Sequence, residues 1–213
     1  MMNVVPAIPH IFIMVMICIA LLCAAFQRKG SCSVYYLVQF SLLVGAYLSY
    51  RAYTGHVSLI FYDSFISDRL SCILNILICL VSFVTFLFSR QYIEERKIAS
   101  SEYYLLGLLA TLGMMVVVSG YSLVTLYMGL ELLALPTYAM VAMERSNGRA
   151  IEAAMKYFVI GAMASGMLLF GMSLIFGATQ SLNLSIISQS VLHTPADQNL
   201  ILLFGLVFLL AGI

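Results

Sequence analysis

The segment SLVTLYMGLELLALP, residues 122–136, is apolar except for one carboxylate, Glu131. Glu131 follows Ser122 by nine residues, which is roughly 14 Å along a helix and near the middle of a hydrocarbon core about 30 Å thick. A charged side chain at that depth costs about 3 kcal/mol on insertion scales. The segment therefore predicts a membrane-spanning helix with a buried acid, and that acid needs a partner, a water molecule or a bound proton.

The rest of the chain has the composition of a membrane protein. Of its 213 residues, 63% are hydrophobic and 9% are charged, against about 25% charged residues in an ordinary soluble domain. Apolar runs occupy residues 8–26, 34–50, 70–89, 103–119, 122–143 and 150–176, and a seventh extends from near Asn199 to Ile213. We predict an all-α, polytopic helix bundle with six complete spans and a truncated seventh. The last run gives only about 22 Å of helix and lacks a polar flank, so we expect the sequence to stop inside that helix.

Basic residues are concentrated in every second connection between the apolar runs. Only Arg51 and Arg69 flank the even-numbered connections, whereas seven basic residues follow the first, third and fifth runs: Arg28, Lys29, Arg90, Arg96, Lys97, Arg145 and Arg149. Because basic residues collect on the cytoplasmic side, we expect the odd-numbered connections in the cytoplasm and the N-terminus outside. The outer connections, about 52–68 and 177–198, contain no recognisable domain.

Several functional classes are excluded by what the sequence lacks. The net charge of +1 and the absence of a basic block argue against a nucleic-acid partner. The five cysteines form no C-x-x-C pair, so neither an iron–sulfur nor a zinc site is indicated. His10, His56 and His193 fall in terminal or loop positions, where we expect no ligand role. No phosphate-binding loop, dinucleotide-binding glycine motif or hydrolase triad is present, so we expect no cofactor and no metal in this chain.

Residues near Glu131 could give it a polar setting. Pro136 cannot donate a hydrogen bond to the carbonyl of Leu132, so that oxygen is released beside Glu131 and we expect a kink. Tyr127 and Tyr138 lie four residues before and seven after Glu131, on the same helical face. Either hydroxyl could bind the carboxyl group or an intervening water, although ordinary packing would also account for both tyrosines.

Lys156 is the second ionisable residue inside a predicted span, about six residues into it. Two interpretations of it remain open. The lysine can reach back to the interface or pair with Glu152 four residues before it. Alternatively, its long side chain extends inward toward Glu131, about 9 Å deeper on straight helices, through a bridging water.

Two motifs in this half of the chain resemble a known family. They are YMGLELLALP, residues 127–136, and RAIEAAMKYF, residues 149–158. With SEYYLL at 101–106 and LLFGM at 168–172, they resemble subunit N of bacterial NADH-quinone oxidoreductase, respiratory complex I. The resemblance is closest from about residue 100 onward, and the first motif favours subunit N over the antiporter-like subunits L and M.

The resemblance implies a proton-pumping membrane subunit of about fourteen helices that contains two inverted five-helix repeats. Residues 1–100 would supply the first three helices, and residues 101–213 would begin the antiporter-like module with helices four to seven. In that family a glutamate on helix five and a lysine on helix six match Glu131 and Lys156 and take part in proton transfer. A further lysine on helix seven would follow Ile213.

The resemblance also implies where the redox chemistry occurs. Flavin, iron–sulfur clusters and the quinone site belong to other subunits, so this chain would hold no redox centre. Its partners would be other membrane subunits and the lipid of a bacterial inner membrane. We predict a proton-translocating subunit coupled to electron transfer from NADH to quinone elsewhere in the complex. A cation/proton antiporter of the same superfamily and a non-transporting scaffold, in which Glu131 stays protonated, remain alternatives.

Overall fold

A computed structural model describes residues 5–26, 33–52, 57–96, 100–144, 146–193 and 196–213 of the chain. In chain order the elements are η1 (Val5–Ala7), α1 (Ile8–Phe26), α2 (Ser33–Ala52), β1 (Ser58–Ile60), β2 (Phe65–Ser67), α3 (Arg69–Glu95), α4 (Ser100–Ser119), α5 (Leu123–Val141), α6 (Gly148–Thr179), α7 (Leu184–His193) and α8 (Ala196–Gly212). The predicted helical bundle is confirmed. Four of the basic residues used to predict orientation lie outside the described ranges: Arg28, Lys29, Lys97 and Arg145.

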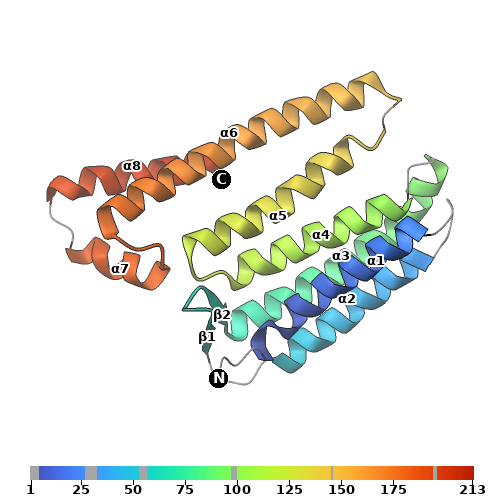
Figure 1. Cartoon of the computed structure of the whole chain (residues 1–213), viewed down its shortest axis with the longest axis horizontal. Coiled ribbons are helices and arrows are strands. Elements are labelled where there is room, and N and C mark those ends of the chain that lie inside the picture. Colours follow the sequence, from blue (N-terminus) through green and yellow to red (C-terminus); the bar gives the residue numbers. More distant parts are fainter. Residues whose placement is uncertain (1–4, 27–32, 53–56, 97–99, 145, 194–195) are drawn as a thin grey trace.

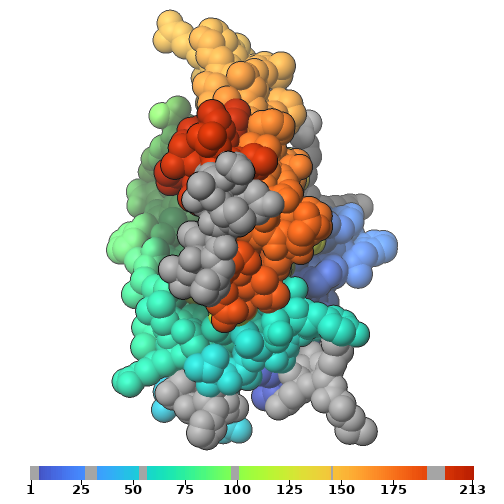
Figure 2. Space-filling view, turned by 90° about the vertical axis from the view of Figure 1, so that its left-hand side faces the viewer, coloured from blue at the N-terminus to red at the C-terminus, as the bar shows by residue number. Residues whose placement is uncertain are grey.

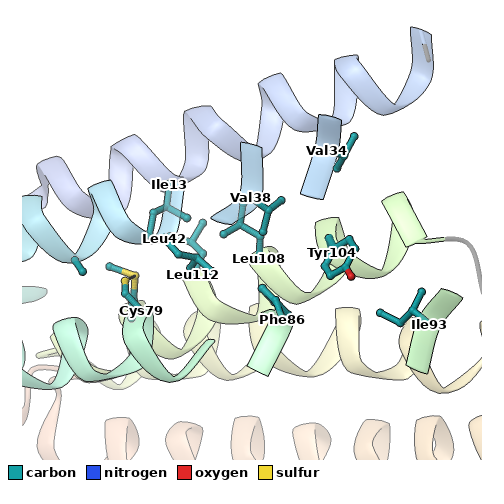
Figure 3. Close-up of a cluster of buried hydrophobic side chains, with 12 residues drawn as sticks. Ile13, Val34, Val38, Leu42, Cys79, Phe86, Ile93, Tyr104, Leu108 and Leu112 are labelled. Atoms are coloured by element: carbon teal, nitrogen blue, oxygen red, sulfur yellow. Dashed lines mark hydrogen bonds between the residues drawn. The ribbon is translucent and has the colours of Figure 1, made fainter. Parts of the chain in front are cut away.

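Helices α1 to α4 pack together as a bundle on one side of α5 (Figure 1). Apolar side chains that point inward from all four helices fill the centre of this bundle (Figure 3). Its buried members are Ile13, Val34, Val38, Leu42, Ala46, Cys79, Phe86, Ile93, Tyr104, Leu108, Leu112 and Met115. Because α4 contributes to this core, the predicted division after residue 100 falls between helices that pack on each other.

Small polar and sulfur side chains meet along the seam between α3 and α4. Asn75 Nδ2 donates to Ser119 Oγ at 3.1 Å, and Thr111 Oγ1 lies 3.2 Å from Ser82 Oγ. Cys79 Sγ lies 3.8 Å from Met115 Sδ, between these two contacts along the seam. Interhelical hydrogen bonds of this kind stabilise helix pairs in membranes, where water cannot satisfy the same groups.

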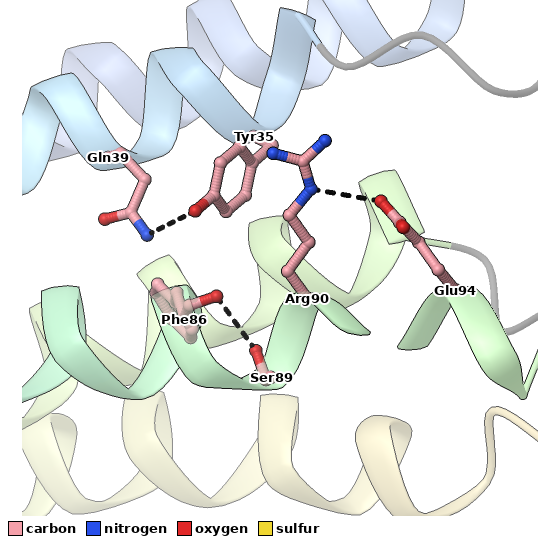
Figure 4. A network of polar contacts seen from close by, with 6 residues as sticks. All are labelled: Tyr35, Gln39, Phe86, Ser89, Arg90 and Glu94. Atoms are coloured by element: carbon pink, nitrogen blue, oxygen red, sulfur yellow. Dashed lines mark hydrogen bonds and ion pairs between the residues drawn. The ribbon is translucent and has the colours of Figure 1, made fainter. Parts of the chain in front are cut away.

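A second polar network ties α2 to α3 (Figure 4). The Arg90 guanidinium lies 5.0 Å from the centre of the Tyr35 ring, and its Nε donates to Glu94 Oε1 at 3.0 Å. Gln39 Nε2 contacts Tyr35 Oη and donates to the Phe83 carbonyl, each at 3.3 Å. This network holds the two helices together at the end where α3 finishes.

Helices α4 and α5 pack so closely that the backbone of each lies next to a glycine of the other. A Cβ atom built on Gly113 would lie 2.5 Å from the backbone nitrogen of Leu133, and one built on Gly129 would lie 2.8 Å from that of Val117. Small residues permit such close packing between membrane helices. These two glycines therefore attach α5 to the α1–α4 bundle.

Beyond α5, the outermost layer is made by α6 and α8. These helices also meet through glycines, since a Cβ atom on Gly205 would lie 3.1 Å from the Gly171 carbonyl oxygen. Figure 2 shows α8, in red, lying against α6, in orange. α5 therefore lies between the α1–α4 bundle and the α6–α8 pair (Figure 1).

Three connections at one end of the helices form a hydrogen-bonded cap, made of residues 58–67, 120–122 and 181–184. The strands β1 and β2 pair antiparallel with Ile60 opposite Phe65, and Phe65 also bridges to Gly120. Ser122 bridges to Asn183, whose Nδ2 donates to the Asp63 carbonyl at 2.9 Å. The backbone groups of this cap therefore satisfy one another.

The outer connections, in which the sequence shows no recognisable domain, carry the hairpin of the cap and the short helix α7. Both elements are short, and the hairpin is held by partners distant in sequence, so neither produces a long periodic pattern. The hairpin turn places Phe61, Tyr62 and Asp63 at positive φ, between 55° and 59°, which few non-glycine residues adopt.

The predicted number of spans is only partly matched. Among the described residues, five helices are long and apolar enough to cross a membrane: α1 with its preceding turn, α3, α4, α5 and α6. α2 does not reach that hydropathy because it carries Gln39, Ser41 and Ser49, which face the bundle interior. The apolar part of α8, Leu200–Gly212, is shorter than a span.

The close α4–α5 contact predicts that adding a side chain at Gly113 destabilises the fold. Gly113→Ala should lower the free energy of unfolding by about 1–3 kcal/mol, because the new methyl group would meet backbone atoms of Leu132 and Leu133 that cannot rotate away. Thermal unfolding of the purified protein in detergent would measure the loss. Gly166→Ala is the matched control, since nothing lies within 4 Å of its Cβ position, and it should be neutral or slightly stabilising. Equal effects of the two substitutions would contradict the packing argument.

Candidate functional site

The candidate site surrounds Glu131 on the face of α5 that is turned toward α6. Glu131 is partly buried among the described residues and lines a cavity of about 370 Å³. The walls come from α5, from α6 and from Gly212 and Ile213 at the end of the chain. The acid therefore faces a cavity with room for several water molecules.

Hydroxyl groups from both helices line the same cavity. Its polar members besides Glu131 are Thr137, Tyr138, Tyr157 and Ser165. Thr137 Oγ1 lies 3.5 Å from Tyr157 Oη, at the edge of hydrogen-bonding distance. A space of this size that combines an acid with several hydroxyl groups suits internal water molecules, which need two to four polar partners each.

Tyr127 and Tyr138 approach Glu131 from opposite directions along α5. Both tyrosines are near enough to the carboxylate to interact with it electrostatically. The helical spacing of four and seven residues predicted this common face, and the structure agrees with it.

Tyr138 is held in place by its neighbours on α6. Its ring packs edge-on against Tyr157, with the ring centres 4.8 Å apart, and against Phe158 at 5.8 Å. Its hydroxyl lies directly over Gly161, where any side chain would overlap it. Gly161 therefore provides the space in which the Tyr138 hydroxyl can face the cavity.

Pro136 lies inside α5 and is fully buried. The helix continues through it as far as Val141. Because proline has no backbone N–H, the Leu132 carbonyl still lacks its usual intrahelical donor, one residue after Glu131. The predicted polar contribution of Pro136 thus persists within a continuous helix.

Lys156 does not meet Glu131. Its Nζ lies 2.6 Å from Glu152 Oε1, and both side chains are about two-thirds exposed in this chain. Lys156 borders a separate, shallow hollow with Met155, Val159 and Ile160, on a different side of α6 from the Glu131 cavity. Of the two arrangements left open by the sequence, the structure has the pair with Glu152.

Two cavity residues were not singled out from the sequence: Thr137 and Tyr157. For Tyr157 the available signal was its spacing from residues 161, 164 and 168, which places these four residues on one face of α6. The prediction for His10 was also incomplete, because His10 belongs to α1 and is buried. Within the described ranges, no group of three or more His, Cys, Asp or Glu residues could hold a metal ion.

Known proteins share this sequence and this arrangement of helices. The transmembrane family described as NADH:quinone oxidoreductase/Mrp antiporter matches residues 120–213. The NADH-quinone oxidoreductase subunit N of Coxiella burnetii is 50% identical over 99% of the chain, and that of Thioalkalivibrio sulfidiphilus is 44% identical over 99%. Over the part it spans, the chain is similar to subunit N proteins of bacterial NADH-quinone oxidoreductase.

Subunit N proteins are longer than this chain, which covers 45% of the Coxiella protein and 44% of the Thioalkalivibrio protein. The match to a transmembrane family, the bacterial subunit N relatives and the five candidate spans together identify a multi-pass inner-membrane protein.

Solved respiratory complexes contain the same fold as this chain. A chain of respiratory complex I from Thermus thermophilus superposes with a TM-score of 0.77 and 26% identity, over 96% of this chain and 42% of its own length. A chain of an archaeal membrane-bound sulfane sulfur reductase superposes with a TM-score of 0.83 at 22% identity, which shows the fold alone. Both are respiratory complexes, so the fold occurs in membrane assemblies.

The contact of Tyr138 with Gly161 predicts energetic coupling between α5 and α6. Gly161→Ala should lower the free energy of unfolding by about 1–3 kcal/mol, because the methyl group displaces the tyrosine. In a Tyr138→Ala background the same substitution should cost much less. A double-mutant cycle by thermal unfolding in detergent measures the coupling, and purely additive effects would contradict the contact.

Proposed function

We propose that this chain forms the N-terminal part of a proton-translocating membrane subunit of an NADH-quinone oxidoreductase. In this proposal, electron transfer from NADH to quinone occurs in other subunits, which hold the flavin, the iron–sulfur clusters and the quinone. Supporting it are the sequence similarity to subunit N proteins and the acid-lined cavity inside the membrane-spanning helices.

The observation that carries the proposal is the setting of Glu131. An intramembrane carboxylate is costly and is usually functional, and this one faces a cavity of about 370 Å³ with hydroxyl groups of Tyr127, Tyr138 and Tyr157 nearby. Glu131 can accept a proton from an internal water and return it, while the hydroxyl groups bind the water molecules between transfers. Pro136 adds an acceptor through the free Leu132 carbonyl.

Lys156 and Glu152 have a supporting part in this proposal. They belong to the same helix as the cavity residues Tyr157 and Gly161, nearer its first residue. Like Glu131, Lys156 matches an ionisable residue of the family motif. A change in the charge of Lys156 would alter the electrostatic potential at the cavity and so favour or oppose protonation of Glu131.

We further propose what each part of the chain contributes and which partners surround it. Residues 1–100 contribute the first three spanning helices, and residues 101–213 begin the translocating module. The partners are other membrane subunits of the complex and the surrounding lipid. The multi-subunit respiratory assemblies in which this fold occurs support such partners.

A cation/proton antiporter is the second candidate. The description of the matching family includes Mrp antiporters, and the same carboxylate cavity could exchange a proton for another cation. Sodium-dependent proton flux in the absence of NADH oxidation would favour this function. Proton flux that depends on NADH oxidation and is indifferent to sodium would favour the first.

Glu131→Gln should reduce proton translocation by at least tenfold while the complex still assembles, because the amide keeps the shape of the side chain but cannot ionise. Proton uptake by membrane vesicles during NADH oxidation measures this loss. Glu144→Gln, on an exposed acid just after α5, is the matched control and should have little effect. Normal translocation by an assembled Glu131→Gln complex would mean that Glu131 is a structural acid in a scaffold.

Lys156→Ala should change the unfolding free energy by less than about 1 kcal/mol, because exposed ion pairs contribute little. Under the proposed role it should nevertheless reduce translocation several-fold, as measured in the same vesicle assay. Arg149→Ala removes another exposed basic side chain from α6 and serves as the control. Full translocation activity of Lys156→Ala would contradict a role for Lys156 and leave only Glu131 in the proposed mechanism.

A further inference from the structure

Two hydroxyl groups of the Glu131 cavity form a hydrogen-bond chain that joins α5 to α6. Thr137 Oγ1 on α5 donates to the Ala134 carbonyl at 2.7 Å, and it lies 3.5 Å from Tyr157 Oη on α6. Both residues line the cavity. The proposed function treats the cavity hydroxyl groups alike, whereas these contacts give Thr137 and Tyr157 separate roles.

The direction of the chain follows from the number of protons in it. A threonine hydroxyl has one proton to donate and two lone pairs with which to accept. The carbonyl of Ala134 can only accept, so it takes the Thr137 proton. Thr137 must therefore accept in its contact with Tyr157, and the phenol is the donor.

Tyr157 is thereby fixed as an acceptor toward any other partner. Its single hydroxyl proton is directed to Thr137, so only lone pairs remain for a group that approaches it from the cavity. The ring is held as well, since it packs edge-on against Tyr138 with the ring centres 4.8 Å apart. Tyr157 thus contacts two consecutive residues of α5, one through its hydroxyl and the other through its ring.

The second of these contacts concerns the residue closest in role to Glu131. The Tyr138 hydroxyl lies directly over Gly161, and Tyr138 is near enough to Glu131 to interact with it electrostatically. Because the Tyr157 ring packs against the Tyr138 ring, the location of the Tyr138 hydroxyl in the cavity depends on Tyr157.

We propose that Tyr157 is a positioning residue of the Glu131 site. The chain through Thr137 to the Ala134 carbonyl holds its hydroxyl as an acceptor, which orients proton donors in the cavity. Its ring holds Tyr138 on the Glu131 side of α6. This inference rests on the proposed function, because it concerns the efficiency of proton transfer through the same cavity.

The test measures NADH-driven proton translocation by membrane vesicles that contain the whole complex. Tyr157→Phe and Thr137→Val should each lower translocation several-fold. The double variant should lose no more than the worse single variant, because both changes break one chain. Thr137→Ser keeps the hydroxyl and should retain most of the activity. Thr85→Val is the matched control and should have no effect, since Thr85 Oγ1 donates to a carbonyl of its own helix on an exposed face of α3.

Equal losses in Thr137→Ser and Thr137→Val would overturn the inference, as would full activity of Tyr157→Phe or multiplicative losses in the double variant. Glu131→Gln in the same vesicles separates this inference from the proposed function. If Glu131→Gln lowers translocation and Tyr157→Phe does not, the positioning role alone is wrong. If neither lowers it, the proposed function is wrong and the positioning role with it.

Infrared spectroscopy of the assembled complex tests the direction of the chain without measuring transport. With isotope-labelled tyrosine, the difference between wild type and Tyr157→Phe isolates the C–O stretching band of Tyr157. The frequency of that band distinguishes a phenol that donates from one that only accepts. We expect a donor band in wild type and in Thr137→Ser, and a shifted band in Thr137→Val. An unshifted band in Thr137→Val would mean that Tyr157 does not donate to Thr137 and would overturn the inference.

Discussion

The backbone contact between α4 and α5 is the interaction on which the rest of the molecule depends. Gly113 and Gly129 bring the two helices within the distance of their main-chain atoms, so that α5 is fixed to the α1–α4 bundle along one side. Lipid competes with apolar side chains for contact, so membrane helices gain most from such close van der Waals packing. Once this side of α5 is occupied, its opposite side, with Glu131 and Tyr138, must face α6. The position of the cavity follows from two residues without side chains.

The molecule satisfies its intramembrane polar groups in two ways. On the α3–α4 seam Asn75 pairs with Ser119 and Thr111 pairs with Ser82, each across the helix interface, so the seam holds helices together. Between α5 and α6 the hydroxyl groups line a cavity around Glu131, and that arrangement suits water and mobile protons. The cost of leaving a polar group unpaired in hydrocarbon is the same in both places. The spacing between the helices decides whether polar residues hold the bundle together or bind water.

Much of the fold could be predicted from apolar runs, because a long span must be covered by consecutive residues of one kind. The run 8–26 coincides with α1, and the predicted starts of α3 and α6 fall within two residues of the observed ones. The cap and α7 could not be predicted, since Phe65, Gly120 and Asn183 pair only after folding. Helical spacing was sufficient for Tyr138 beside Glu131. It was insufficient for Lys156, whose flexible side chain could have reached either carboxylate.

The cap has a consequence for the cavity. Its main-chain groups join the first residue of α5 to the segment after α6, with Leu123 N–H donating to the Leu182 carbonyl at 2.9 Å. The cap therefore fixes the start of α5 beside the end of α6, the two helices that supply most of the residues around the Glu131 cavity. A hairpin distant in sequence from Glu131 thus helps to set the distance between the walls of its cavity.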